Sequence, residues 1–535
     1  MKTLLVVCLF SASAVAGNAV NPETIDLEPI PVPVESTSDM DRPVALPASA
    51  FALMEPATPE SQGVSSAAIL KWIDACEKTF DAGPDGALHG FVIVRHGKVI
   101  AEGSWKPFDT LNETHMLYSH SKSFTSSAIG FLVDEGKVDL DERLVDILPE
   151  DVPAKPDPRL GEIRVRDLLT MNVGADGDHT IGRNPSEWTK WFMKKELQRR
   201  PGTGFRYDSD ATYMLAAIVE KKSGEKMMDY LKRKMFDRIG ITKAWSTCSP
   251  EGIPCGGWGM NMTTRELARF GQLYLNRGEW DGEQLLSPDW VSLATTRQTW
   301  CGGITIQAQT IGSGSDWSQG YGFQFWRCRH GAYRADGAGG QYTIVFPDAD
   351  AVVSIHAGLG DMQKELNLVW DHLLPAFQDA PLPEYPSAQA ALKDRLAKLM
   401  IKPLNGSMSS SANPEKIDCT FELKDNSRAF KSVRFESAPN GCFCTVVSRA
   451  GEQKFPASFG VWTEGSIKID TENYEALWSY IGEHKTMASC GFDKDGSFHL
   501  RAYLTGTTAY LGFTVRDGKL TGEFWAMNGC ELESK

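Results

Sequence analysis

The chain lacks a long apolar segment beyond its first residues, and it lacks an excess of basic residues. Its 55 Lys and Arg are outnumbered by 69 Asp and Glu, so the formal net charge is −14. A surface of this sign disfavours contact with phosphate backbones, and we expect no nucleic-acid partner. An apolar share of 42% and a charged share of 23% are typical of a globular protein and exclude collagen, coiled coil and general disorder.

Several catalytic signatures are also missing. The sequence has no Gly-x-Ser-x-Gly elbow, no His-Glu-x-x-His helix and no Cys-x-x-Cys pair. The enzyme classes that depend on those motifs are therefore not indicated, and any catalytic chemistry has to come from another arrangement of residues.

The first sixteen residues are typical of an export signal, predicted as residues 1–16. Lys2 supplies a positive charge, an apolar stretch runs from Leu4 to Phe10, and Ala14-Val15-Ala16 fits a small-residue cleavage site. The apolar stretch is short for a bilayer span, although an uncleaved anchor is the alternative. We therefore expect a secreted or periplasmic protein with no membrane span after cleavage.

Cysteine usage is consistent with export. Cleavage after Ala16 would remove Cys8 from the 11 cysteines and leave an even number. An even number in an exported chain permits disulfides, and Cys248 and Cys255 are near enough in sequence to close a local loop. The connectivity does not follow from the sequence, and some of these cysteines can equally be free residues of the core.

The 535 residues are too many for one domain of ordinary size, and the pattern changes along the chain. Residues 17–55, rich in Pro, Glu, Ser and Ala, predict an extended arm. Residues 56–385 have strand signals at both ends and helical segments between them, which predicts one mixed sheet closed by distant segments. A helix and linker follow over 386–414, and the short strands and turns of 415–535 predict a separate β domain, either a sandwich or a barrel.

Periodicity locates some of the individual elements. Apolar residues at helix spacing predict a helix over 69–80, and two short apolar runs at 91–94 and 99–101 predict a β-hairpin. Strand signals return over 321–326, then over 342–346 and 352–356.

The strongest local signal for chemistry is the segment Ser119-His120-Ser121-Lys122, which opens an apolar helical pattern. Ser119 would lie at the start of this helix, and Lys122, three residues on, would share its face. A serine hydroxyl becomes a good nucleophile when a nearby group takes its proton, and a buried lysine can do so. The alternative is a helix-capping serine followed by a solvated lysine. His120 would point to a different face and is a poor candidate for the base.

Two further segments carry groups suited to such a site. Tyr207 lies on an expected loop before an apolar helix, where it could shuttle a proton, although a packed surface aromatic is the alternative. The segment Gly337-Ala338-Gly339-Gly340 leads into a predicted strand. Glycines there let backbone N–H groups approach a substrate, as an oxyanion hole requires, although an ordinary turn has the same composition.

In their order and spacing, these segments resemble the motifs of the serine β-lactamase-related family. Its members include class C β-lactamases, D-Ala-D-Ala carboxypeptidases, family VIII carboxylesterases and 6-aminohexanoate-dimer hydrolases. Residues 165–171, 267–275 and 322–326 also look like stretches of this family. The resemblance covers the region of about 55–385 and implies an α+β fold, in which an antiparallel sheet carries helices and a helical subdomain.

The resemblance also implies roles for individual residues. Ser119 matches the nucleophile, Lys122 its proton acceptor, and Tyr207 the group that protonates the leaving group and later activates water. The backbone N–H groups of Ser119 and Ala338 would form the oxyanion hole. Acyl transfer of this kind proceeds through an acyl-enzyme and needs no cofactor and no metal. The residues expected close to the substrate are Ser209, Gly337 and Gly339.

Two departures from the family pattern bear on the substrate. Ser209 stands where β-lactamases carry Asn. The glycine-rich segment that begins at Gly337 is preceded by Ala335 and Asp336, where the family pattern has a lysine that would bind the carboxylate of a β-lactam or peptidoglycan peptide. The missing lysine argues against β-lactamase and carboxypeptidase activity and favours the aminohexanoate-dimer hydrolase and esterase side of the family.

We therefore expect an exported serine hydrolase that acts on a small-molecule ester or small amide. The alternatives are a D-amino-acid peptidase or β-lactamase, and a non-catalytic ligand-binding protein on the same fold. The joint presence of Ser119, Lys122 and Tyr207 argues against the binding protein. A homo-oligomer and the role of the β domain stay open.

Overall fold

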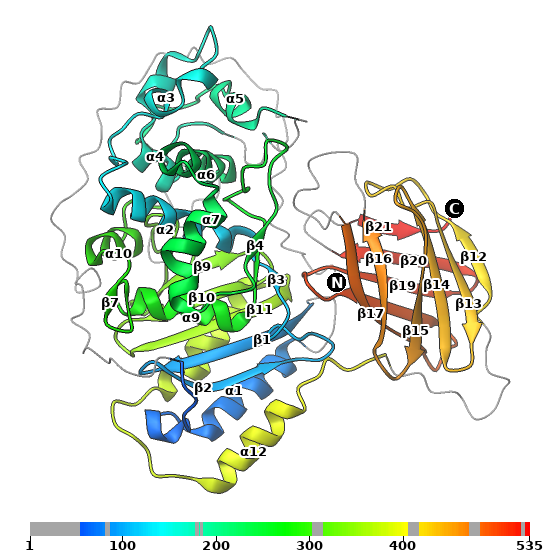
Figure 1. Ribbon diagram of the computed structural model, residues 1–535. Helices are drawn as coiled ribbons and strands as arrows, with labels where there is room; N and C mark the ends of the chain where they lie inside the picture. Colours follow the sequence, from blue (N-terminus) through cyan, green and yellow to red (C-terminus); the bar gives the residue numbers. More distant parts are fainter. Residues whose placement is uncertain are drawn as a thin grey trace.

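The computed structural model shows an α+β domain followed by an all-β domain (Figure 1). The predicted signal peptide, nearly all of the predicted arm and the glycine- and serine-rich linker lie outside the described residues. The structure describes residues 54–80, 86–176, 181, 186–301, 314–404, 417–469, 482–525 and 530–535.

A six-stranded sheet forms the centre of the first domain, in the order β2-β1-β11-β10-β9-β8. The N-terminal hairpin pairs with the last strand of the domain, for example Val92 with Ser354, so distant segments close the sheet as predicted. Every pairing in it is antiparallel, which confirms what the family resemblance implies and corrects the mixed sheet expected from the strand pattern alone. The strands are β1 (Gly86–Arg95), β2 (Lys98–Ser104), β8 (Trp326–Arg327), β9 (Tyr333–Gly337), β10 (Gln341–Phe346) and β11 (Ala351–Leu359).

The strand expected over 321–326 is wrong for most of its length, because only Trp326 enters a strand. Gln324 has a left-handed backbone with φ of 67°, and the Gly322 N–H donates to the carbonyl of Phe325 at 2.8 Å. This turn interrupts the extended conformation that the apolar residues favour.

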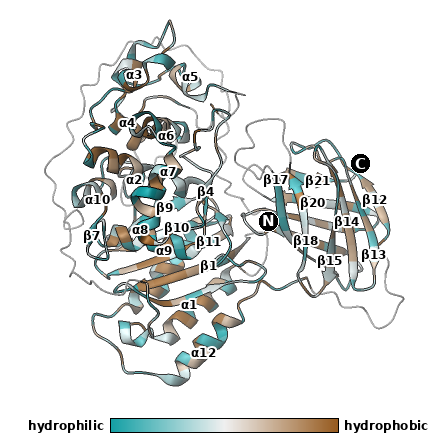
Figure 2. Ribbon diagram, in the orientation of Figure 1, coloured by the Kyte–Doolittle hydropathy of each residue, from teal (hydrophilic) through white to brown (hydrophobic). Residues whose placement is uncertain are grey.

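Helices cover both faces of the sheet (Figure 1). One face packs against α1 (Ser66–Thr79), α11 (Met362–Leu368) and α12 (Pro386–Ala397), and the other against α9 (Thr264–Leu275). The predicted helical periodicity is confirmed in α1, whose buried apolar residues are Ile69, Trp72, Ile73 and Cys76. With helices on both sides, β1, β10 and β11 are buried along their whole length, and Figure 2 shows hydrophobic residues along β1.

A helical subdomain is built around α2 (Ser121–Asp134), in which every residue from Ser121 to Leu132 is buried. Its neighbours include α6 (Ser209–Ser223) and α7 (Met227–Leu231). The other short helices are α3 (Leu144–Ile147), α4 (Val165–Leu169), α5 (Trp188–Met193), α8 (Asp237–Ile239) and α10 (Pro288–Thr295). Two small sheets complete it, with strands β3 (His115–Met116), β4 (Trp245–Ser246), β5 (Met260–Met262), β6 (Glu279–Trp280) and β7 (Glu283–Gln284).

The all-β character of the C-terminal domain is confirmed, and its sheet closes on itself. The last strand meets the first, because Lys535 N–H donates to Glu422 O and Lys424 N–H to Glu533 O, both at 2.9 Å. This closure selects the barrel over the sandwich. Its strands are β12 (Cys419–Glu422), β13 (Ser432–Ala438), β14 (Gly441–Ser448), β15 (Gly451–Phe459), β16 (Thr463–Ile469), β17 (Gly482–Phe492), β18 (Phe498–Leu504), β19 (Tyr510–Arg516), β20 (Lys519–Trp525) and β21 (Cys530–Glu533).

The expectation of disulfides is not met by the ten cysteines that the structure describes, all of which carry free thiols. Cys255 is buried and its sulfur accepts a hydrogen bond from the Thr247 hydroxyl at 3.6 Å, whereas Cys248 is exposed. The two side chains therefore occupy different environments in spite of their nearness in sequence. Within the described ranges, no helix has the length and hydropathy needed to cross a membrane.

Candidate active site

Ser119 lies in a single 3-10 turn, Tyr118–His120, directly before α2. The turn is tight, because Tyr118 has a left-handed backbone with φ of 50°. The buried Ser121 hydroxyl holds it by donating to the Tyr118 carbonyl at 2.7 Å and accepting the Met260 N–H at 3.1 Å. The structure thus places Ser119 at the N-terminus of a buried helix, as the sequence predicts, where the helix dipole favours negative charge.

Lys122 is buried beside Ser119. Its Nζ lies 3.0 Å from Ser119 Oγ, 2.8 Å from Ser209 Oγ and 2.7 Å from the carbonyl oxygen of Gly257. Only 1% of the residue is exposed, so the alternative of a solvated lysine is wrong.

The oxygens of Ser119, Ser209 and Gly257 suit both the charged and the neutral form of Lys122. An ammonium donates to all three oxygens. A neutral amine donates to Ser209 Oγ and to the Gly257 carbonyl, which can only accept, and its lone pair is then left to accept the Ser119 hydroxyl proton. The geometry therefore allows proton transfer between Ser119 and Lys122 without any movement of the lysine.

Tyr207 precedes α6 on a loop, and its ring lies over the same amine, with Lys122 Nζ 4.8 Å from the ring centroid. The ring also stacks on Trp326, with centroids 5.7 Å apart and planes at 19°. Phe205 and Tyr321 extend this aromatic cluster. Tyr207 is therefore packed against aromatic rings and also lies beside Lys122, and its role in proton transfer stays a prediction.

An ion-pair network that the sequence analysis missed holds the Tyr207 loop in place. Lys195 Nζ lies 2.9 Å from an oxygen of Asp208 and 2.8 Å from one of Asp210, and all three side chains are at most 9% exposed. Asp208 also caps α6 by accepting the Asp210 N–H at 2.9 Å. Burial alone would lower the pKa of Lys195, but the two carboxylates outweigh it and hold that pKa above its usual value.

Gly337 brings the end of β9 against the turn that carries Ser119. A Cβ at this position would lie 2.0 Å from the Leu117 carbonyl oxygen and 3.2 Å from the His120 nitrogen, so only glycine fits. The chain then turns through Ala338 and Gly339, whose φ is 78°. This close approach sets the Ala338 end of β9 beside the Ser119 turn, as an oxyanion hole formed by their two amides requires.

Asp336 occupies the position next to Gly337, where its carboxylate binds the Arg334 guanidinium at 2.8 Å. Burial raises the pKa of Asp336, while the charges of Arg334 and Lys122 oppose that shift. Arg334 is fully buried and is therefore engaged by this carboxylate rather than offered to a substrate. Arg206, the residue directly before Tyr207, pairs with Asp176, with Nε 3.5 Å from the carboxylate.

Gly257 is a second residue that sequence reasoning missed. Its carbonyl binds Lys122, and a Cβ there would lie 2.6 Å from the backbone oxygen of Ser209. The pair Gly256-Gly257 was the only local signal, since adjacent glycines often mark a close approach of two backbones. Lys195 had no such signal, because it stands among other charged residues.

His120 is not part of the proton-transfer arrangement. Its ring stacks over Phe124 with centroids 5.8 Å apart, and burial lowers its pKa to about 3. His120 is therefore a buried residue packed on Phe124, and the expectation that it is not the base stays a prediction. In the part of the chain described here, no group of three or more His, Cys, Asp or Glu side chains is arranged to hold a metal ion.

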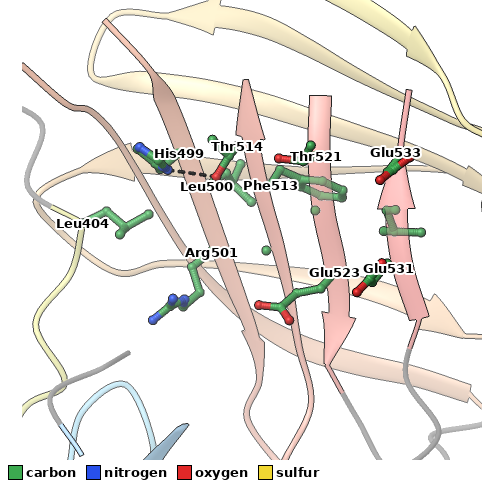
Figure 3. A pocket seen from close by; sticks show the side chains of 13 residues that line it. Leu404, His499, Leu500, Arg501, Phe513, Thr514, Thr521, Glu523, Glu531 and Glu533 are labelled. Atoms are coloured by element: carbon green, nitrogen blue, oxygen red, sulfur yellow. Dashed lines mark hydrogen bonds between the residues drawn. The ribbon is translucent and has the colours of Figure 1, made fainter. Parts of the chain in front are cut away.

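A separate cavity of about 420 Å³ lies on β18–β21 in the C-terminal domain (Figure 3). None of the expected site residues lines it. Its polar side chains include His499, Arg501, Glu523, Glu531 and Glu533.

Comparison with known proteins gives one matching family model, described as Beta-lactamase, over residues 73–365. The 6-aminohexanoate-dimer hydrolase of Paenarthrobacter ureafaciens is 25% identical over 331 residues, which cover 58% of this chain and 81% of that protein. The lovastatin esterase of Penicillium rubens is 24% identical over 171 residues, or 27% of this chain and 42% of that one.

Among solved structures, the octameric penicillin-binding protein homologue from Pyrococcus abyssi aligns with a TM-score of 0.46 and 17% identity. It covers 87% of this chain and 99% of its own. The family match spans more than half of the sequence, and this chain therefore belongs to the beta-lactamase family of serine hydrolases.

Proposed function

We propose that this protein is an exported hydrolase that cleaves an ester or a small amide through an acyl-enzyme on Ser119. The observation that carries the proposal is the buried amine of Lys122, 3.0 Å from Ser119 Oγ and held by two further oxygens. A serine needs such a partner to become a nucleophile at neutral pH.

The proposed reaction uses these groups in the roles that the family resemblance implies. Ser119 Oγ attacks the substrate carbonyl carbon while Lys122 Nζ takes the hydroxyl proton. The negative charge that develops on the carbonyl oxygen is stabilised by the N–H groups of Ser119 and Ala338. Tyr207 gives a proton to the departing alkoxide or amine, and Lys122 returns its proton to Tyr207. Water, deprotonated by the same groups, then attacks the acyl-enzyme and releases the acid.

The substrate class is supported by what replaces the family's lysine. The carboxylate of Asp336 is bound to Arg334, which is fully buried, so neither residue offers a substrate carboxylate the accessible positive charge that the family's lysine would supply. The names of the two relatives, a 6-aminohexanoate-dimer hydrolase and a lovastatin esterase, support an amide or an ester as the bond that is cleaved. Export is supported by the N-terminal segment ending at Ala16.

The test is the mass of the intact protein after brief exposure to a panel of p-nitrophenyl esters, a p-nitroanilide and a penicillin, with product release followed in parallel. We expect a covalent adduct or turnover with an ester or the anilide. Ser119→Ala should abolish both, whereas Ser292→Ala, a serine on α10, should leave both unchanged. Ester turnover by folded Ser119→Ala would refute the assignment of the nucleophile. Reaction with the penicillin alone would refute the substrate class.

A further inference from the structure

The turn between β18 and β19, residues 505–509, joins the C-terminal domain to the catalytic domain. Loop tips are usually exposed, but Thr505, Thr507, Thr508 and Ala509 are here at most 6% exposed. Thr507 builds the turn itself, because its hydroxyl donates to the Leu504 carbonyl at 2.8 Å and accepts the Ala509 N–H at 3.0 Å. The Thr508 side chain is directed instead to the other domain.

The first contact of this turn is with the segment that carries Ser119. The Gly506 carbonyl accepts the N–H of Met116 at 2.9 Å, three residues before Ser119. The hydroxyls of Thr508 and Tyr118 are hydrogen-bonded at 2.6 Å, and Tyr118 is the residue directly before Ser119. A buried phenol needs a hydrogen-bond partner, and the C-terminal domain supplies this one.

The second contact is with the turn that carries Ala338. A Cβ on Gly339 would lie 2.8 Å from Cγ2 of Thr508, so the threonine methyl packs directly on this glycine. A Cβ on Gly358, in the neighbouring strand β11, would lie 3.2 Å from the Thr508 carbonyl oxygen. Thr508 therefore touches both turns whose amides the proposed oxyanion hole uses.

The backbone of Tyr118 is strained, and the hydrogen bond to Thr508 helps to hold it in that conformation. A left-handed conformation is unfavourable for a bulky residue, and it persists only where the surrounding structure holds it. The hydroxyl lies at the end of the Tyr118 side chain, so a hydrogen bond there restrains the orientation of the whole residue. Fixing it to Thr508 restrains the direction of the Ser119 N–H and of Ser119 Oγ.

We propose that Thr508 is a positioning residue for the nucleophile, so that the C-terminal domain completes the catalytic site of the first domain. The inference rests on the proposed role of Ser119. It assigns to the β domain a part in acylation, and it predicts that the chemical step, rather than substrate binding, depends on the Thr508 hydroxyl.

The experiment compares Thr508→Val with Thr508→Ser in the full-length protein. The readouts are the rate at which a fluorophosphonate labels Ser119, kcat and KM for an activated ester, and the melting temperature. Thr508→Val keeps the shape and loses the hydroxyl, so we expect labelling and kcat to fall about tenfold with KM unchanged. Thr508→Ser should retain both within about twofold. Thr521→Val, an exposed threonine on β20, is the matched control and should behave as wild type.

Tyr118→Phe provides the second arm. It removes the other hydroxyl of the same hydrogen bond, so it should cause a similar loss, and the double variant should lose no more than either single one. Wild-type labelling in folded Thr508→Val would overturn the inference and leave the proposed function standing. The inference would also be overturned if the fold-losses in labelling rate and kcat of the two single variants multiplied in the double variant. A loss in Thr508→Ser equal to that in Thr508→Val would overturn it as well. If the wild-type protein itself failed to label on Ser119, the proposed function would fail and this inference with it.

Discussion

Removing the charge of Lys195 should destabilise the protein far more than removing that of Lys190, five residues earlier. In Lys195→Met, the carboxylates of Asp208 and Asp210 stay buried, at 1% and 0% side-chain exposure, without the cation that neutralises them. Breaking a buried ion pair from one side costs about 3–5 kcal/mol. Lys190 pairs with Glu187 at 2.6 Å, but their side chains are 42% and 53% exposed, and solvent screening leaves such a pair contributing little to stability.

The assay is thermal unfolding followed by circular dichroism, with the rate of ester hydrolysis measured well below the transition. We expect Lys195→Met to lower the melting temperature by about 5 °C or more, and Lys190→Met to change it little. Activity should fall as well, because Asp208 caps α6 and lies between Tyr207 and Ser209.

A combined variant separates loss of the ion pair from loss of packing. Lys195→Met with Asp210→Asn removes one of the two uncompensated charges, so it should recover a substantial part of the lost stability. If Lys195→Met cost less than about 1 kcal/mol, or if the combined variant were no more stable than Lys195→Met alone, the reasoning from burial would be refuted.

Three further predictions follow from the site and its surroundings. Tyr207→Phe keeps the ring on Trp326 and should lower kcat by about 10²-fold or more, and kinetics near the wild-type value would move proton transfer to another group. Gly337→Ala should reduce both activity and melting temperature, because its Cβ would lie 2.0 Å from the Leu117 carbonyl oxygen. Gly161→Ala, whose Cβ would meet nothing within 4 Å, should change neither. Burial lowers the pKa of His89, His115 and His356 in the folded protein, and that of His115 to about 4. At a pH below the ordinary histidine pKa of 6.5, the unfolded chain therefore binds more protons than the folded protein does. Stability should therefore fall as the pH is lowered from about 6.5 towards 4, and a flat profile of denaturant midpoints over that range would contradict this reading.

Local spacing explains why Ser119 and Lys122 could be paired from the sequence. Residues three apart on a helix share a face whatever the rest of the chain does, and the apolar pattern after Lys122 predicted that helix. The hairpin of β1 and β2 and the helix α1 were predicted for the same reason, since each is defined by residues close together in the chain.

Contacts between distant segments could not be predicted in this way. Lys195 binds Asp208 and Asp210 across a bend of the chain, and Gly257 reaches Lys122 from another part of the helical subdomain. Neither has a periodic pattern around it. The strand pattern alone likewise did not give the antiparallel direction of the central sheet, which the family resemblance implied.

The sequence by itself indicated the kind of chemistry, because the order and spacing of a serine, a lysine three residues later and a tyrosine before a second helix resemble the motifs of a serine hydrolase family. It also determined the presence of a separate β domain, since short alternating strands differ from helical periodicity. Only the tertiary structure decided that Lys122 is buried, that Arg334 neutralises Asp336, and that Thr508 meets Tyr118 across nearly four hundred residues of chain. These are consequences of burial and close packing, which bring together groups that no spacing in the sequence relates.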